Sequence, residues 1–241
     1  MAEFQLVGSP EPFLLARLKR GEKIFCESDA MVTMEPNLVI GGQLRGGLFQ
    51  SFMRKFTTGE SLFQQEIKAA NGDGECLLSP ISGDMKVLKV DQAHQYILSD
   101  GSFLAATETV QVKAKVQTNL GGAIFGDTGG FVVMETGGYG DLCISGSGTL
   151  MELDIDTTQS GGEYIVDNGH CVAWTNTLSY TIGLPTSNGG FLGGLLGSVT
   201  SGEGMVLKFR GKGTVVVCSR NSKSYLTWLV AALGLNNSNR G

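Results

Sequence analysis

Apolar and polar residues alternate along much of this chain, in short runs separated by glycine-rich turns. The clearest run is 110–117, where Val and Ala alternate with Gln and Lys without a break. Residues 151–156 alternate in the same way. A period of two is typical of a β-strand with one buried and one solvated face, so the pattern predicts antiparallel, half-buried sheets and an all-β fold.

One pattern, an apolar strand, a tight polar turn and a second apolar strand, occurs three times. The three stretches are Ile24–Leu38, Tyr96–Val110 and Tyr164–Leu178. Aligned on Asp29, Asp100 and Asn168, they are 100 − 29 = 71 and 168 − 100 = 68 residues apart. A period this regular predicts three copies of one β unit. In the third copy, Asn168-Gly169 predicts a type I′ turn, which needs positive φ at both residues.

Two segments have helical features. Leu48, Phe49, Phe52, Met53 and Phe56 form an apolar stripe with helical spacing, and 225–235 is helical in composition. The second segment is too short to span a membrane, so we expect it to pack on the sheet or on a neighbour. The predicted organisation is a single globular domain, 1–241, with repeats at about 4–90, 91–156 and 157–220 and a helical tail at 221–241.

Composition and charge narrow the function classes. Charged residues are 17% of the chain, Gly is 36 of 241 residues and Pro only 5, which suits short strands and tight turns. The formal charge is 18 − 23 = −5, the wrong sign for a surface that follows nucleic-acid phosphates. Lys113 and Lys115 are therefore interpreted as the solvated face of a strand.

Cysteine usage and the N-terminal sequence indicate the compartment. The five cysteines include no CxxC pair, and several lie in apolar runs, so we expect reduced, buried thiols rather than disulfides or metal ligands. Residues 1–10 lack the features of a signal peptide, and no apolar run reaches the roughly 18 residues of a membrane span. We expect a soluble, cytoplasmic protein.

Candidate catalytic chemistry is sparse. Asp167 and His170 lie close together at the third turn and could form an Asp–His pair, but polar groups beside tight turns usually bond the backbone. His94 is interpreted as a loop residue. The sequence contains no Gly-x-Ser-x-Gly elbow and no Walker pattern. We therefore predict no catalytic, cofactor-binding or metal-binding residues, with Asp167 and His170 as the one polar site to check.

Four blocks of residues resemble a known family. They are Gly21-Glu22 with Glu27, Ala30, Met31 and Met34; Gly46-Gly47 with Arg54 and Gly59-Glu60-Ser61; Asp167–Ala173; and Gly202–Met205 with Phe209, Gly211, Gly213 and Ser219-Arg220. In this order they resemble the family of altered inheritance of mitochondria protein 24, over about 4–220. Two positions depart from the family pattern, Asp127–Gly130 in the middle copy and Cys218.

The resemblance implies a fold and no established reaction. The implied fold is three tandem β-sandwich repeats, similar to a double-stranded β-helix, about a pseudo-threefold axis, as in the tryptophan RNA-binding attenuation protein. Mitochondrial relatives are linked to inner-membrane organisation, a role that need not hold for a chain without a targeting segment.

Three Gly-rich apolar segments follow the second hairpin strand of each copy, at 41–56, 120–125 and 189–197. About a threefold axis they would gather at one end of the molecule, as a cap on the core, a protein or oligomer contact, or a membrane-surface contact beside Arg45, Arg54 and Lys55. The predicted contact residues are Leu48, Phe49, Phe52, Met53, Phe56, Ile124, Phe125, Phe191, Leu192 and Leu195.

The leading functional prediction is a non-enzymatic β scaffold that acts through protein contacts or self-association, without a cofactor. The alternatives are a small-ligand or RNA-binding module, a protein associated with the membrane surface, and a hydrolase-like enzyme centred on Asp167 and His170.

Overall fold

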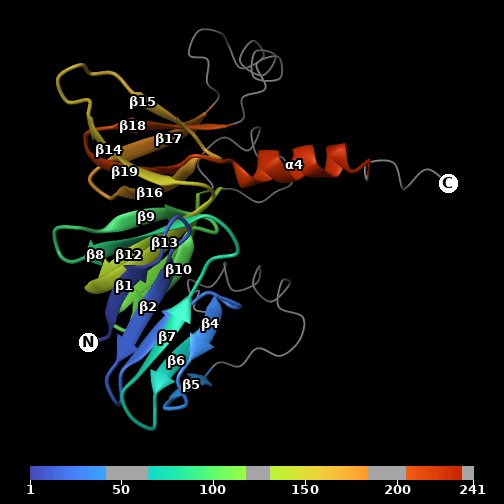
Figure 1. Ribbon diagram of the computed structural model, residues 1–241. Coiled ribbons are helices and arrows are strands. Elements are labelled where there is room, and N and C mark those ends of the chain that lie inside the picture. Colours follow the sequence, from blue (N-terminus) through green and yellow to red (C-terminus); the bar gives the residue numbers. More distant parts are fainter. Residues whose placement is uncertain (42–64, 118–130, 184–204, 235–241) are drawn as a thin grey trace.

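The computed structural model describes residues 1–41, 65–117, 131–183 and 205–234 (Figure 1). Their regular structure is almost entirely antiparallel β, in four sheets, with one helix, α4 (Ser222–Ala232). The predicted all-β class is confirmed.

The strands of each sheet pair with their neighbours in the following order. Sheet A contains β1 (Glu3–Val7), β2 (Phe13–Leu18), β7 (Gly74–Leu78) and β4 (Met31–Met34). Sheet B contains β5 (Leu38–Gly41), β6 (Gln65–Ala69), β3 (Lys23–Cys26), β10 (Phe103–Thr107), β13 (Gly140–Gly146) and β8 (Asp84–Val90). Sheet C contains β11 (Val110–Gln117), β12 (Phe131–Gly138), β9 (Tyr96–Ser99), β16 (Cys171–Thr175), β19 (Lys212–Cys218) and β14 (Leu150–Asp156). Sheet D contains β15 (Tyr164–Asp167), β18 (Val206–Arg210) and β17 (Ser179–Gly183).

The sheets pack in the order A, B, C, D, with an apolar core between each consecutive pair. In Figure 1 sheet D lies at the top, and sheet A lies in the lower half together with β5 and β6 of sheet B. The first core lies between sheets A and B and includes Leu14 and Ile24. The second lies between B and C and includes Leu88 and Leu98. The third lies between C and D and includes Trp174 and Phe209. Burial of these side chains is the main stabilising term.

Strand pairing follows the same order in three consecutive sets of six strands. We call β2–β7 unit 1, β8–β13 unit 2 and β14–β19 unit 3. In each unit the first, sixth and third strands lie side by side, in that order, in one sheet. The fourth, fifth and second strands lie side by side, in that order, in the next sheet. Two junctions join the units: β3 of unit 1 pairs with β10 of unit 2, and β9 of unit 2 pairs with β16 of unit 3.

The third strand of every unit carries a β-bulge at the same place. The bulges begin at Met31, Phe103 and Cys171, so the spacings are 103 − 31 = 72 and 171 − 103 = 68 residues. The sequence alignment on Asp29 and Asp100 was therefore wrong by one residue. Asp29 corresponds to Gly101, and both have positive φ, 64° and 77°. The pseudo-threefold axis stays a prediction.

Alternation located the strands well. The strand predicted at 110–117 is confirmed to the residue, with Val110 and Val112 buried and Gln111 exposed. The predicted C-terminal helix is confirmed as α4, three residues earlier than expected. It extends away from the sheets in Figure 1 and leaves Trp228 62% exposed, so it does not pack on the sheet. The other expected arrangement, packing on a neighbour, stays a prediction. The helical stripe of Leu48–Phe56 lies outside the described residues.

Candidate functional site

The turn between β15 and β16 holds the two polar residues that the sequence singled out. The His170 ring Nδ1 lies 2.8 Å from the carbonyl oxygen of Cys218, and Asp167 Oδ1 accepts a hydrogen bond from the Gly169 N–H at 2.8 Å. The two side chains thus each bond the backbone, and no hydrogen bond between them occurs in the described structure. This arrangement stabilises the turn and supplies no base-activated nucleophile.

The same turn differs from the type I′ form that Asn168-Gly169 predicts. Neither residue has positive φ, and the His170 N–H bonds the Asp167 carbonyl at 3.1 Å. The Asp167 side chain directs this geometry, because Asp bonds a backbone N–H two residues on. Gly169 is instead required by close approach: a Cβ there would overlap the Asn221 side-chain amide.

His94, the other histidine, lies on the surface. Its ring Nδ1 is 2.9 Å from Asp91 Oδ1, and both side chains are more than half exposed. This contact lowers the pKa of Asp91, and the hydrogen bond from the His94 side chain is the largest cause of the shift. Among the described residues, no group of three or more His, Cys, Asp or Glu could hold a metal ion.

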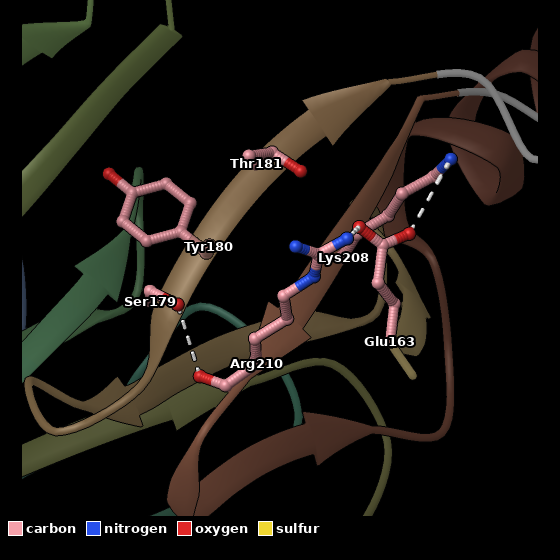
Figure 2. Close-up of a pocket in the computed structure, with 6 residues that line it drawn as sticks. All are labelled: Glu163, Ser179, Tyr180, Thr181, Lys208 and Arg210. Carbon is pink, nitrogen blue, oxygen red and sulfur yellow. Dashed lines mark hydrogen bonds and ion pairs between the residues drawn. The ribbon is translucent and has the colours of Figure 1, made fainter. Parts of the chain in front are cut away.

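A shallow polar hollow of about 200 Å³ lies on sheet D (Figure 2). Glu163 lines it, with one carboxylate oxygen 2.9 Å from the Arg210 guanidinium and the other 4.0 Å from Lys208 Nζ. Ser179 and Thr181 line the side formed by β17, and the Tyr180 ring packs on Trp174 at 4.9 Å. Two cations thus share one carboxylate, which leaves a net positive hollow suited to an acidic group.

A second hollow, of about 310 Å³, lies on sheet A at the other end of the molecule. It differs from the first in its lining, which combines the apolar residues Leu15, Leu77 and Met34 with two carboxylates, Glu35 and Glu75. Arg17, beside it, donates to Glu75 at 2.7 Å.

Several edge strands expose apolar side chains, among them Met151 on β14, at 56%, and Val39 and Ile40 on β5, at 39% each. Two other edge strands, β15 and β4, have the same feature. On β15, Tyr164 is 42% and Ile165 48% exposed, and on β4, Val32 is 47% exposed. Each strand has only one partner in the described structure, β18 for β15 and β7 for β4. Sequence reasoning missed both edges, because which strand lacks a neighbour depends on long-range pairing. The one available signal was the contrast between these strands and their counterparts in the other copies.

The structure does not describe the predicted contact surface. All ten of its residues, from Leu48 to Leu195, lie outside the described residues. No helix in the described part of the chain is long and apolar enough to cross a membrane.

All five cysteines are buried and free, as expected. Burial raises the pKa of the Cys26 and Cys76 thiols to about 12 and also raises the pKa of Cys171 and Cys218. Because the thiolate is the reactive form, we expect a thiol reagent at about pH 8 to label none of the five until the protein unfolds.

The same shifts predict a pH dependence of stability. The folded state keeps the Cys26 and Cys76 protons above the unfolded pKa of about 8.5, so stability is fully present below that pH and falls as the pH rises toward 12. Urea titrations from neutral to alkaline pH should show this decline, and a variant with Cys26→Ala and Cys76→Ala should show a shallower one. Native-state labelling at the rate of the unfolded chain would contradict both expectations.

The fold and its surfaces define a class: an all-β protein of stacked antiparallel sheets. In the described part of the chain, its exposed features include strand edges, shallow hollows and a projecting helix. The chain belongs to the family described as Mitochondrial biogenesis AIM24, whose model matches residues 4–220. It is 32% identical over 221 residues to an uncharacterized protein of Streptococcus pyogenes serotype M6, covering 89% of this chain and 84% of that protein. A crystal structure of a protein from Streptococcus pyogenes has the same fold, with a TM-score of 0.78 and 30% identity over 96% of this chain and all of that one.

Proposed function

We propose that this protein is a non-enzymatic scaffold that associates with copies of itself through the exposed edges of its sheets. The proposal treats the three units as copies of one element, so that each position in one unit has counterparts in the other two. The recurring pairing order and the recurring bulge support this treatment.

The observation that carries the proposal is a difference in burial between counterparts. Val32 on β4 is 47% exposed, whereas Leu104 and Val172 at the same place in units 2 and 3 are 0% and 2% exposed. Ile165 on β15 is 48% exposed, whereas its counterpart Ile97 is 9% exposed and its other counterpart, Phe25, is partly buried. The side chains that the junctions cover inside the chain are thus uncovered at its two ends.

Edges of this kind favour association. An edge strand presents unpaired N–H and C=O groups, and soluble proteins usually protect it with a charge or a proline. The exposed part of β15, Tyr164-Ile165, carries neither. The helix α4 adds exposed Tyr225, Leu226 and Trp228, an apolar surface of the kind that marks contact sites.

The polar turn supports a role without catalysis. Asp167 and His170 both bond the backbone, and the carboxylate of the polar hollow is held between two cations. These contacts make the hydrolase-like alternative the weaker one.

Light scattering coupled to size-exclusion chromatography tests the proposal. We expect the purified full-length chain to run above the mass of one chain and to dissociate on dilution. A mass of one chain, 25.5 kDa, at every concentration would end the proposal of self-association.

A further inference from the structure

We infer that two of the sheet edges are partners: β15 of one copy pairs antiparallel with β4 of the next, repeating the junctions inside the chain. This inference rests on the proposed function and specifies the partner as a second copy in a head-to-tail arrangement. Such a contact is heterologous, so successive copies form a ring if the rotation closes and a filament if it does not.

The internal junctions define the geometry. At the first, β3 pairs with β10, with Cys26 opposite Ala105 and Ile24 opposite Thr107. At the second, β9 pairs with β16, with Leu98 opposite Ala173 and Tyr96 opposite Thr175. Relative to the bulge, the two registers are identical. In both cases the second strand of one unit joins the third strand of the next.

One second strand and one third strand take part in no junction inside the chain. β15 is the second strand of unit 3, and β4 is the third strand of unit 1, and Figure 1 places them at opposite ends of the stack. A pairing of the two within one chain is therefore excluded by their positions. Carrying the register over places Tyr164 opposite Glu35, Ile165 opposite Met34 and Val166 opposite Thr33 of the next copy.

Side-chain packing at the junctions agrees with this pairing. Leu104 of unit 2 lies in the first core and Val172 of unit 3 lies in the second, so the bulge residue of each third strand inserts into the core of the preceding unit. The corresponding residue of unit 1 is Val32, which has no preceding unit and is exposed. In the proposed contact it reaches the third core of the neighbouring copy, beside Val166.

The hollow on sheet A is a second, independent observation. Its lining residues Leu15, Thr33 and Leu77 correspond by register to Val87, Ala105 and Cys143 of unit 2. Those three counterparts lie in the first core or pack against it, covered by unit 1. The hollow is therefore the surface that a preceding unit would cover, and in the proposed contact unit 3 of another copy covers it.

One difference makes the contact between copies weaker than the second internal junction. At that junction the Asn176 N–H donates to the Gln95 carbonyl at 2.9 Å. The counterpart of Asn176 in unit 1 is Pro36, which lies just after the end of β4 and has no N–H to donate. The contact between copies thus has one hydrogen bond fewer, which favours a reversible, concentration-dependent assembly.

Two variants that block opposite edges test the inference. Val32→Glu blocks β4 and Ile165→Glu blocks β15, and both positions are about half exposed, so the fold should tolerate either change. Each variant alone should be monomeric, because its affinity for self-association should fall by at least about tenfold. An equimolar mixture should form a dimer and nothing larger, because it contains one intact β15 and one intact β4. Ile81→Glu, at a 98% exposed loop position, is the matched control and should assemble like the unmodified chain.

The outcomes separate the inference from the proposed function. An unmodified chain that stays monomeric overturns the self-association itself. An unmodified chain that assembles, with single variants that still assemble or a mixture that stays monomeric, overturns the β15–β4 pairing and leaves self-association standing.

A disulfide across the contact tests the register. The double variant Glu35→Cys with Tyr164→Cys should give disulfide-linked multimers under mild oxidation. Val39→Cys with Tyr164→Cys is the control, because Val39 is also exposed but lies on β5, away from the contact, and it should not. Equal cross-linking of the two variants would contradict the register.

Discussion

Replacing Trp174 by Ala is expected to destabilise the protein more than any other single truncation in the third core. The side chain is fully buried and contacts the Tyr180 and Phe209 rings edge-on, with centroids 4.9 and 5.5 Å away. Truncation of a buried Trp costs about 3–5 kcal/mol through lost burial and the cavity left behind. Urea unfolding followed by circular dichroism measures this loss.

The second tryptophan provides the matched control. Trp228 on α4 is 62% exposed, so Trp228→Ala should change the free energy of unfolding by no more than about 0.5 kcal/mol. Trp174→Phe should cost less than Trp174→Ala, because it keeps most of the ring contacts and removes an indole Nε1 that is buried without a hydrogen-bond partner among the described residues. Equal losses for Trp174→Ala and Trp228→Ala would contradict this account of the core.

Replacing Gly140 by Ala is expected to cost about 3 kcal/mol, from a clash and from backbone strain together. A Cβ on Gly140 would overlap Thr107 Oγ1, which accepts a hydrogen bond from the Asp141 N–H at 3.0 Å. Gly140 also has φ of 137°, which residues with a side chain rarely adopt. The free energy of unfolding from urea titration is again the measurement.

Two further variants separate the clash from the strain. Gly101→Ala reports strain alone, because Gly101 has φ of 77° and no atom within 4 Å of the added Cβ. It should cost about 1 kcal/mol. Thr107→Ala removes the clashing oxygen, so the loss in the double variant with Gly140→Ala should be smaller than the sum of the single losses. Strict additivity would show that the clash contributes nothing.

Local patterns in the sequence predicted most of the strands, because alternation reports directly which side chains face a core. The run at 110–117 was predicted to the residue. Turn geometry was harder: Asn168-Gly169 fits a type I′ turn in isolation, but the hydrogen bond from Gly169 to Asp167 and the approach of Asn221 select another form. The second effect involves a residue more than 50 positions away, which no local pattern contains.

The candidate site depended even more on long-range pairing. A strand such as Tyr164–Asp167 has the same local pattern whether it lies inside a sheet or at its edge. Its exposure follows from the identity of its neighbours, which emerges only when β9 pairs with β16 and β15 is left with β18 alone. The sequence did place the three strand–turn–strand stretches in comparable positions, and that comparison is what makes the exposed ends recognisable. The prediction that each stretch is a hairpin was wrong, because its two strands pair with other strands in different sheets.

Because Leu104 and Val172 lie in the core of the unit before their own, the boundaries along the chain do not coincide with the boundaries of the packed interior. Excising one unit would remove side chains that complete its neighbour's core and expose the neighbour's apolar residues to water. We therefore expect the three units to unfold in one cooperative transition, and the smallest fragment of this architecture that folds to be longer than any single unit.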